Sequence, residues 1–193
     1  MRNQNIVNLS VPQTKEQPDD ESCRSSKAGA TDAIKIEYRP VPIPQQGEVL
    51  IRVRAFGLNR SELFTRQGLS PKTAVTLPRI LGIEAVGTVE YAPNSEFREG
   101  QTVATAMGGM GRLFDGGYAE YTCVPANQVQ FINTNLTWDV LGALPEMLQT
   151  AWGSLFISLN LKNDETLLVR GGTTSVGLAA TAIAKSIGAR VLA

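Results

Sequence analysis

Thr166-Leu-Leu-Val-Arg-Gly-Gly-Thr-Thr-Ser-Val-Gly177 is the stretch from which the fold of this chain can be inferred most directly. Its first five residues form a short apolar run, which is typical of a buried strand in a parallel sheet. Apolar side chains then recur at helical spacing at Val176, Ala180, Ile183 and Ile187. Gly188 is suited to end this helix, and residues 189–193 begin another strand. The sequence therefore predicts one complete βαβ unit.

The glycine-rich turn between this strand and helix lies where dinucleotide-binding proteins hold a pyrophosphate. Gly172 is expected to let the backbone turn tightly, and Gly177 to let the helix pack close to the strand. The amides of Thr174, Ser175 and Val176, together with the helix dipole, are expected to point toward the pyrophosphate. The candidate cofactor-binding residues of this turn are Gly172, Thr173, Thr174, Ser175, Val176 and Gly177. Because Thr174 replaces the middle glycine of GxGxxG, a tight turn in another kind of α/β protein is the alternative.

Upstream of the βαβ unit, the sequence predicts a domain of many short strands. The β-rich runs, broken by Gly, Pro and Asn, cover residues 34–38, 49–55, 84–90, 101–105, 118–124 and 129–132. Short helices are predicted over 59–66, from Thr137, and from Pro145 to about Ser158. Gly68 is expected to end the first of them in the left-handed conformation. Strands without long helices indicate a small barrel-like domain over residues 33–136, and residues 137–193 are assigned to linking helices and the start of a nucleotide-binding domain.

Residues 1–32 are polar and have little to bury, so we expect a disordered tail, with an edge strand over Ile6–Val11 as the alternative. The loop Met107–Arg112 is expected to be a mobile rim, since no helix follows it.

The composition narrows the class of ligand. Lys+Arg and Asp+Glu are equal at 18 each, so no net charge favours nucleic acid or an anionic membrane. No apolar run is long enough to span a bilayer, and the first residues lack the apolar segment of a secretory signal. A cytoplasmic protein with a small-molecule ligand is therefore expected. The chain has no histidine, and Cys23 and Cys123 show no metal-binding spacing, which argues against catalytic zinc and imidazole-dependent triads.

Five segments together resemble the medium-chain dehydrogenase/reductase superfamily, and specifically its zinc-independent quinone oxidoreductase branch. In the order and spacing of that family they are GEVLIRVRAFGLNRSELFTRQG, PRILGIEAVGTVE, FDGGYAEYTCVPANQV, LPEMLQTAWGSLF and LLVRGGTTSVGLAATAIAKSIGA. The resemblance implies a GroES-like β-barrel domain followed by a Rossmann domain, of which only the first βαβ unit is present. It also implies NADPH as hydride donor, with NADH as the alternative, and a carbonyl, quinone or enoyl substrate.

The same resemblance suggests individual site residues. Asn59 matches an asparagine whose carboxamide faces the nicotinamide, and Thr150 matches a threonine that touches the nicotinamide ribose. Zinc-dependent relatives carry a Cys near Asn59 and a Gly-His-Glu where this chain has Gly82-Ile-Glu84, which implies that no zinc is bound. Glu84 could be a polar residue of the cleft floor, and Arg66 could supply positive charge at the cleft mouth. Each of these residues also has a structural alternative: Asn59 as a helix N-cap, Thr150 bonded to a helix carbonyl, Glu84 in an ion pair, and Arg66 on a solvated helix face, which is the expected place for it.

The resulting hypothesis is direct hydride transfer to a quinone or an electron-poor C=C bond, with Asn59 as the electrophilic hydrogen-bond donor and solvent as the proton source. Two alternatives remain: a truncated non-catalytic fragment, or an accessory subunit that acts as an enoyl reductase within a biosynthetic complex. A full-length form is expected to be a homodimer, whereas this chain is not.

Overall fold

The computed structural model describes residues 19–193. The strands are β1 (Asp19–Ser25), β2 (Ile34–Pro40), β3 (Glu48–Ala55), β4 (Arg79–Ile80), β5 (Glu84–Tyr91), β6 (Thr102–Ala106), β7 (Tyr121–Pro125), β8 (Val129–Phe131), β9 (Thr166–Leu168) and β10 (Arg190–Leu192). The helices are α1 (Arg60–Gln67), α2 (Trp138–Gly142), α3 (Pro145–Trp152) and α4 (Ser175–Ser186), with a π-helical turn η3 (Gly153–Ser158) and 3₁₀ turns η1 (Thr31–Ala33) and η2 (Ala126–Gln128). The candidate edge strand Ile6–Val11 lies outside the described residues.

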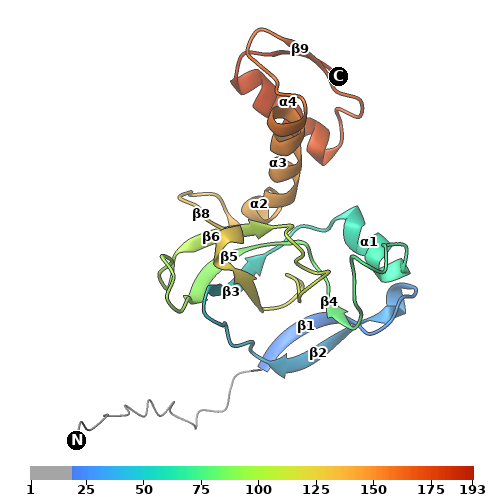
Figure 1. Ribbon diagram of the computed structural model, residues 1–193, viewed down its shortest axis with the longest axis vertical. Helices are drawn as coiled ribbons and strands as arrows, with labels where there is room; N and C mark the ends of the chain where they lie inside the picture. The colour runs from blue at the N-terminus through green and yellow to red at the C-terminus, as the bar shows by residue number, and fades with distance from the viewer. Residues whose placement is uncertain (1–18) are drawn as a thin grey trace, which may run out of the picture.

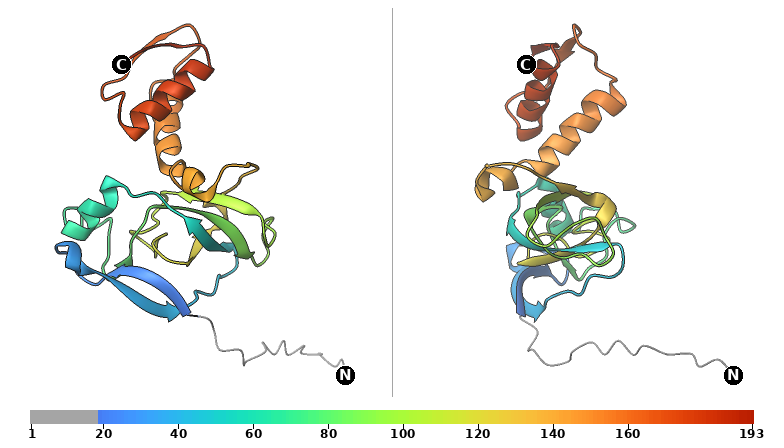
Figure 2. Two further views of the ribbon diagram at one scale, coloured as in Figure 1. Left: turned by 180° about the vertical axis from the view of Figure 1, so that it is seen from behind. Right: turned by 90° about the vertical axis from the view of Figure 1, so that its left-hand side faces the viewer.

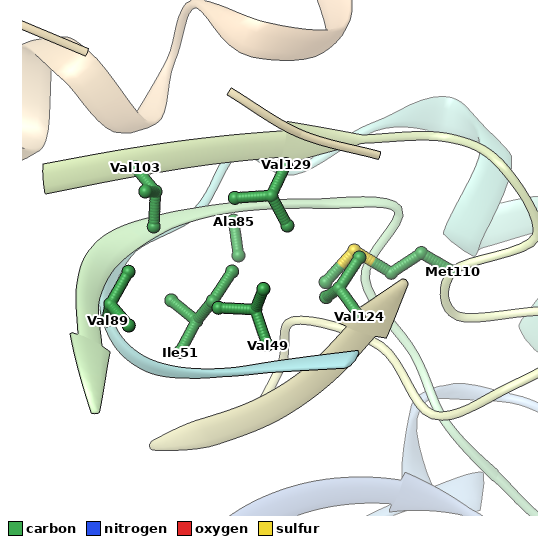
Figure 3. Packing of buried hydrophobic residues seen from close by; sticks show 8 residues of the cluster. All are labelled: Val49, Ile51, Ala85, Val89, Val103, Met110, Val124 and Val129. Carbon is green, nitrogen blue, oxygen red and sulfur yellow. The ribbon is translucent and has the colours of Figure 1, made fainter. Parts of the chain in front are cut away.

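Residues 19–131 form an antiparallel β-structure that curls on itself (Figure 1). A five-stranded sheet has the order β7-β3-β5-β6-β8, and a three-stranded sheet has the order β2-β1-β4. Figure 3 shows the aliphatic side chains that fill the curled sheet. They are Val49, Ile51, Ala85, Val89, Val103, Met110, Val124 and Val129, each at most 4% exposed. The predicted barrel-like domain is confirmed, because alternating β-branched residues form the strands that the sequence indicated.

Strand β1 corrects the expected disordered tail, since residues 19–25 pair along their whole length with β2. Three of its polar side chains, Asp20, Ser22 and Ser25, are buried because they find partners in the fold. Asp20 is 2% exposed, and its Oδ1 accepts the amides of Glu120 at 2.9 Å and Tyr121 at 3.2 Å. The hydroxyl of Ser22 donates to the carbonyl of Glu37 at 3.3 Å. Composition predicted disorder here because these partners lie far away in the sequence.

The loop Met107–Arg112, expected to be a mobile rim, is anchored at two points. Met110 is fully buried in the core of the curled sheet. Arg112 Nη2 donates to Ser61 Oγ at 2.6 Å, which ties the loop to α1. The sequence did not reveal this anchoring because a single apolar residue in a glycine-rich loop has no periodicity.

Residues 138–193 are mainly helical and lead away from the barrel (Figure 2). Helix α2 still packs on the barrel, where Leu141 joins Val86 and Ala104 in a small apolar cluster. Helix α3 continues through η3, and its Ala151 and Leu155 pack against α4 in a separate core. Strands β9 and β10 are parallel, with α4 between them in the sequence, so the predicted βαβ unit is confirmed. Within residues 19–193, no helix has both the length and the apolar character needed to cross a membrane.

The buried carboxyl group of Asp20 is expected to make stability depend on pH. Burial raises the pKa of Asp20 from 3.8 to about 6, although the amides of Glu120 and Tyr121 partly oppose the shift. Between these two values the folded chain binds more protons than the unfolded chain, so the folded state loses stability as the pH rises toward about 6.

Asp20→Asn keeps an oxygen acceptor for both amides but cannot ionise, so it should lose this part of the pH dependence. Urea midpoints of the wild type and the variant, measured across that pH range, test the expectation. The exposed neighbour Asp19→Asn serves as a control for the loss of one charge. Parallel pH profiles for wild type and Asp20→Asn would show that Asp20 is not responsible.

Candidate functional site

Asn59 occupies the N-cap position of α1, but its side chain makes no capping hydrogen bond. Its Nδ2 instead donates to Glu84 Oε1 at 2.7 Å. Gly57 makes this arrangement possible, because a Cβ at that position would overlap the carboxylate of Glu84. The N-cap alternative for the Asn59 side chain is therefore wrong, while its predicted role toward a substrate stays a prediction.

Glu84 begins β5 and is 2% exposed. Its second oxygen, Oε2, accepts the backbone amide of Glu146 at 2.8 Å, in the first turn of α3. Glu84 thus joins the barrel, the start of α1 and the start of α3. Within the described chain Glu84 makes no ion pair, so the predicted ion-pair alternative is wrong. Burial raises the pKa of Glu84, the hydrogen bonds from Asn59 and Glu146 lower it, and the charges of Glu146 and Glu62 raise it.

Thr150 lies one turn further along α3 and connects to the same group of residues. Its hydroxyl donates to Glu146 Oε1 at 2.9 Å, not to a helix carbonyl as the structural alternative proposed. Thr150 lines an open groove of about 370 Å³ together with Met107, Gly153 and Ile157. Asn59, Glu84 and Thr150, which are far apart in the sequence, are therefore brought into one chain of hydrogen bonds.

Two buried residues beside this chain were not predicted. Glu62 is 5% exposed, its Oε1 accepts the amide of Ile83 at 3.0 Å, and its Oε2 has no partner among the described residues. Tyr118 is 9% exposed and stacks on Phe56, with 4.7 Å between ring centroids. The spacing Asn59-x-x-Glu62 resembles a capping box, which predicts a Glu folded back on its own helix, and so it gave no indication of this contact.

The ionisation of both residues is disfavoured. Burial raises the pKa of Glu62, against hydrogen bonds that lower it, of which the amide of Ile83 is the largest. Burial, assisted by the nearby charges of Glu62 and Glu84, raises the pKa of Tyr118. This end of the barrel therefore holds protons more tightly than exposed side chains would. Arg66, expected on a solvated helix face, is instead 8% exposed and donates to the carbonyl of Gly29 at 2.8 Å.

The glycine-rich turn before α4 differs from the prediction in two details. The left-handed residue is Gly171, with φ +80°, and not Gly172. The amide of Thr174 donates to the carbonyl of Gly171 at 3.0 Å, so it is used within the turn and does not point toward a ligand. Thr174 Oγ1 accepts the amide of Gly177 at 3.1 Å and caps the helix.

The remaining groups of the turn fit an anion. The amides of Ser175 and Val176 belong to the first turn of a 12-residue helix and have no acceptor within it. The helix dipole adds positive potential at the same place. Gly177 approaches the turn so closely that a Cβ would overlap the carbonyl oxygen of Gly171.

Among residues 19–193, no group of three or more His, Cys, Asp or Glu side chains is placed to hold a metal ion.

The chain is similar in sequence and in fold to known proteins. A family model described as the alcohol dehydrogenase GroES-like domain matches residues 45–133. Human quinone oxidoreductase is 33% identical over 167 residues, which are 85% of this chain and 49% of that protein. The chain thus spans about half the length of the curated relatives that it matches.

Solved structures with a similar fold cover about half of their own length with this chain. The human synaptic vesicle membrane protein VAT-1 homolog-like protein has a TM-score of 0.80 at 26% identity, over 90% of this chain and 55% of that one. A mycobacterial protein complexed with NADPH has a TM-score of 0.77 at 28% identity, over 89% of this chain and 50% of that one.

The close approach of Gly177 to the turn predicts a specific loss of stability. Gly177→Ala places a methyl group against the carbonyl of Gly171 and should lower the free energy of unfolding by about 1–3 kcal/mol. Gly153→Ala is the matched control, since a Cβ there meets no atom within 4 Å, and it should raise stability by about 0.5–1 kcal/mol. Urea denaturation followed by circular dichroism measures both effects. Equal stability for the two variants would contradict the packing described here.

Proposed function

We propose that this chain, which belongs to the medium-chain dehydrogenase/reductase superfamily, carries the catalytic barrel and the first nucleotide-binding unit of an NADPH-dependent oxidoreductase. Its fold is a GroES-like β-barrel followed by the start of a Rossmann domain. We propose the division between them at about residue 136. The observation that carries the functional proposal is the turn at the start of α4, whose Ser175 and Val176 amides have no acceptor within the helix, in a chain whose relatives include quinone oxidoreductases.

The proposed ligand of that turn is the diphosphate of the cofactor. The amides of Ser175 and Val176 would bind its oxygens, and the hydroxyl groups of Thr173 and Ser175 would add donors. Thr150 is proposed to contact the nicotinamide side of the cofactor from α3. The complex of a mycobacterial relative with NADPH favours that nucleotide, and NADH is the alternative. When bound, the reduced nicotinamide supplies the hydride.

Asn59 is proposed to stabilise negative charge on the substrate oxygen. One N–H of its amide is used by Glu84 at 2.7 Å, and the second N–H of the same nitrogen is proposed to bind the substrate. A neutral donor of this kind can bind the oxyanion of an enolate or hydroquinone as it forms. The substrate class is accordingly a quinone, an enone or an enoyl group, and the proton comes from solvent.

The proposed reaction does not use zinc. In this chain the acidic partners of Asn59 are Glu84 and Glu62, which offer neither the thiolates nor the imidazoles that zinc prefers in enzymes. An amide hydrogen bond then takes the electrophilic role that a metal ion otherwise fills.

A second candidate function is an accessory or non-catalytic role, such as an enoyl-reductase-like subunit of a biosynthetic complex. It is favoured by the two-stranded parallel sheet of β9 and β10, where Leu168 is 69% and Leu192 is 46% exposed. Exposed leucines on a short sheet are suited to packing against further polypeptide. The two candidate functions differ in whether this chain turns over NADPH without a partner.

A nucleotide titration tests the proposed cofactor site. NADPH should quench or shift the tryptophan emission of the chain, because Trp152 lies on α3 close to Thr150 and is 52% exposed. Gly177→Ala, which distorts the turn, should abolish the change. NADH is titrated in parallel to compare the two nucleotides. If neither reduced nucleotide binds to the wild type, the oxidoreductase proposal is wrong.

Removal of the Asn59 amide tests the catalytic proposal. Asn59→Ala should lower kcat for a simple para-quinone by roughly tenfold to a thousandfold, which is the scale of losing one oxyanion donor. The measurement is the loss of NADPH absorbance, with the exposed Asn135→Ala as control. Unchanged turnover in Asn59→Ala would remove this residue from the mechanism.

A further inference from the structure

We infer that Glu84 is a positioning residue, whose carboxylate decides which atom of the Asn59 amide occupies the site and couples that amide to the helix that carries Thr150. The inference rests on the proposed function, in which the Asn59 N–H is the electrophilic donor. Glu84 would thus orient the Asn59 amide, which is a role that neither a residue that only fills the core nor a member of an ion pair would have.

The first step of the argument is the orientation of the Asn59 amide. An asparagine side chain offers N–H donors on one atom and an acceptor oxygen on the other, and a rotation of 180° exchanges the two. A carboxylate accepts hydrogen bonds and donates none, so Glu84 Oε1, at 2.7 Å, tolerates only the nitrogen. The reverse orientation would place the Asn59 oxygen against a buried carboxylate. Glu84 therefore fixes the nitrogen, together with its second N–H, in the position that the proposed reaction needs.

The second step is the connection to α3. Glu84 Oε2 accepts the Glu146 amide at 2.8 Å, and this amide belongs to the first helical turn, where no acceptor exists within the helix. The side chain of Glu146 in turn accepts the hydroxyl of Thr150 at 2.9 Å. One carboxylate thus determines the place of the Asn59 donor and of the first turn of α3, whose Glu146 holds Thr150.

The third step is the close packing around the Glu84 carboxylate. Glu84 is 2% exposed, so water does not compete for its oxygens. Gly57 lies against Oε1 so closely that any Cβ would overlap it. A carboxylate enclosed in this way has one arrangement of its two hydrogen bonds.

Glu84→Gln is the sharpest test, because it keeps the shape and removes one acceptor. The glutamine has one oxygen for two donors, and the backbone amide of Glu146 cannot rotate. The oxygen of the new side chain should therefore serve Glu146, and its NH₂ group should face Asn59, which rotates to accept. We expect kcat to fall by roughly tenfold to a thousandfold, as for loss of an oxyanion donor, while the affinity for NADPH is retained because α3 stays in place. Glu90→Gln, an exposed residue on the same strand, should leave both values unchanged.

A spectroscopic readout separates positioning from stability. In ¹⁵N-labelled chain, the side-chain amide signals of Asn59, assigned by their loss in Asn59→Ala, should show one strongly deshielded, hydrogen-bonded proton. In the wild type, the chemical shifts of these Asn59 signals should change as Glu84 is protonated at acidic pH. In Glu84→Gln, the signals should lie near the chemical shifts of solvent-exposed amides, and they should no longer change with pH. The pH titration of the wild type needs no variant, so the inference can be tested even if Glu84→Gln does not fold.

Each outcome has a distinct meaning. The inference is wrong if the chemical shifts of the Asn59 side-chain amide change neither with pH nor in Glu84→Gln. It is also wrong if Glu84→Gln loses thermal stability but keeps full turnover. A wild-type chain that binds no reduced nucleotide contradicts the proposed function alone, because the Asn59 signals still report whether Glu84 holds the amide.

Discussion

The site depends on one buried carboxylate that has no cation beside it. An ionised group of this kind is tolerated in an interior only when hydrogen bonds replace its water. Glu84 obtains them from Asn59 and from the amide of Glu146, which belong to different elements. Because neither oxygen can be left unsatisfied, the start of α1 and the start of α3 must stay in contact with β5. The placement of the starts of α1 and α3 against β5 therefore follows from the solvation of a single side chain.

The same physical rule recurs elsewhere in the barrel. Asp20 accepts the amides of Glu120 and Tyr121, and Glu62 accepts the amide of Ile83. In each case a carboxylate provides an acceptor for backbone amides that the sheet ladders leave unpaired. These bonds attach β1 to β7, and α1 to the segment before β5. The curled sheet is thus filled by aliphatic side chains, while its edges and ends are held together by carboxylates.

The sequence was informative where the determinants are local. Periodicity placed the barrel strands and α4, and Gly68 ended α1 in the predicted left-handed conformation. It was misleading where polar residues are buried, as in β1 and at Arg66. It was incomplete in the glycine turn, where Gly171 and not Gly172 is left-handed and Thr174 caps the helix. For the candidate site it supplied Asn59, Thr150 and the turn, but not Glu62 or Tyr118.

The amino-acid sequence by itself determined the class of fold and the βαβ unit, because hydrophobic periodicity, turn residues and the order of motifs depend on neighbours along the chain. Only the tertiary structure decided which polar atoms meet. Asn59 and Glu84 are 25 residues apart, Glu84 and Glu146 are 62 apart, and Asp20 and Glu120 are 100 apart. A carboxylate in a sequence has no partner until the chain has folded, and its hydrogen bonds are fixed by the packing that excludes water from it.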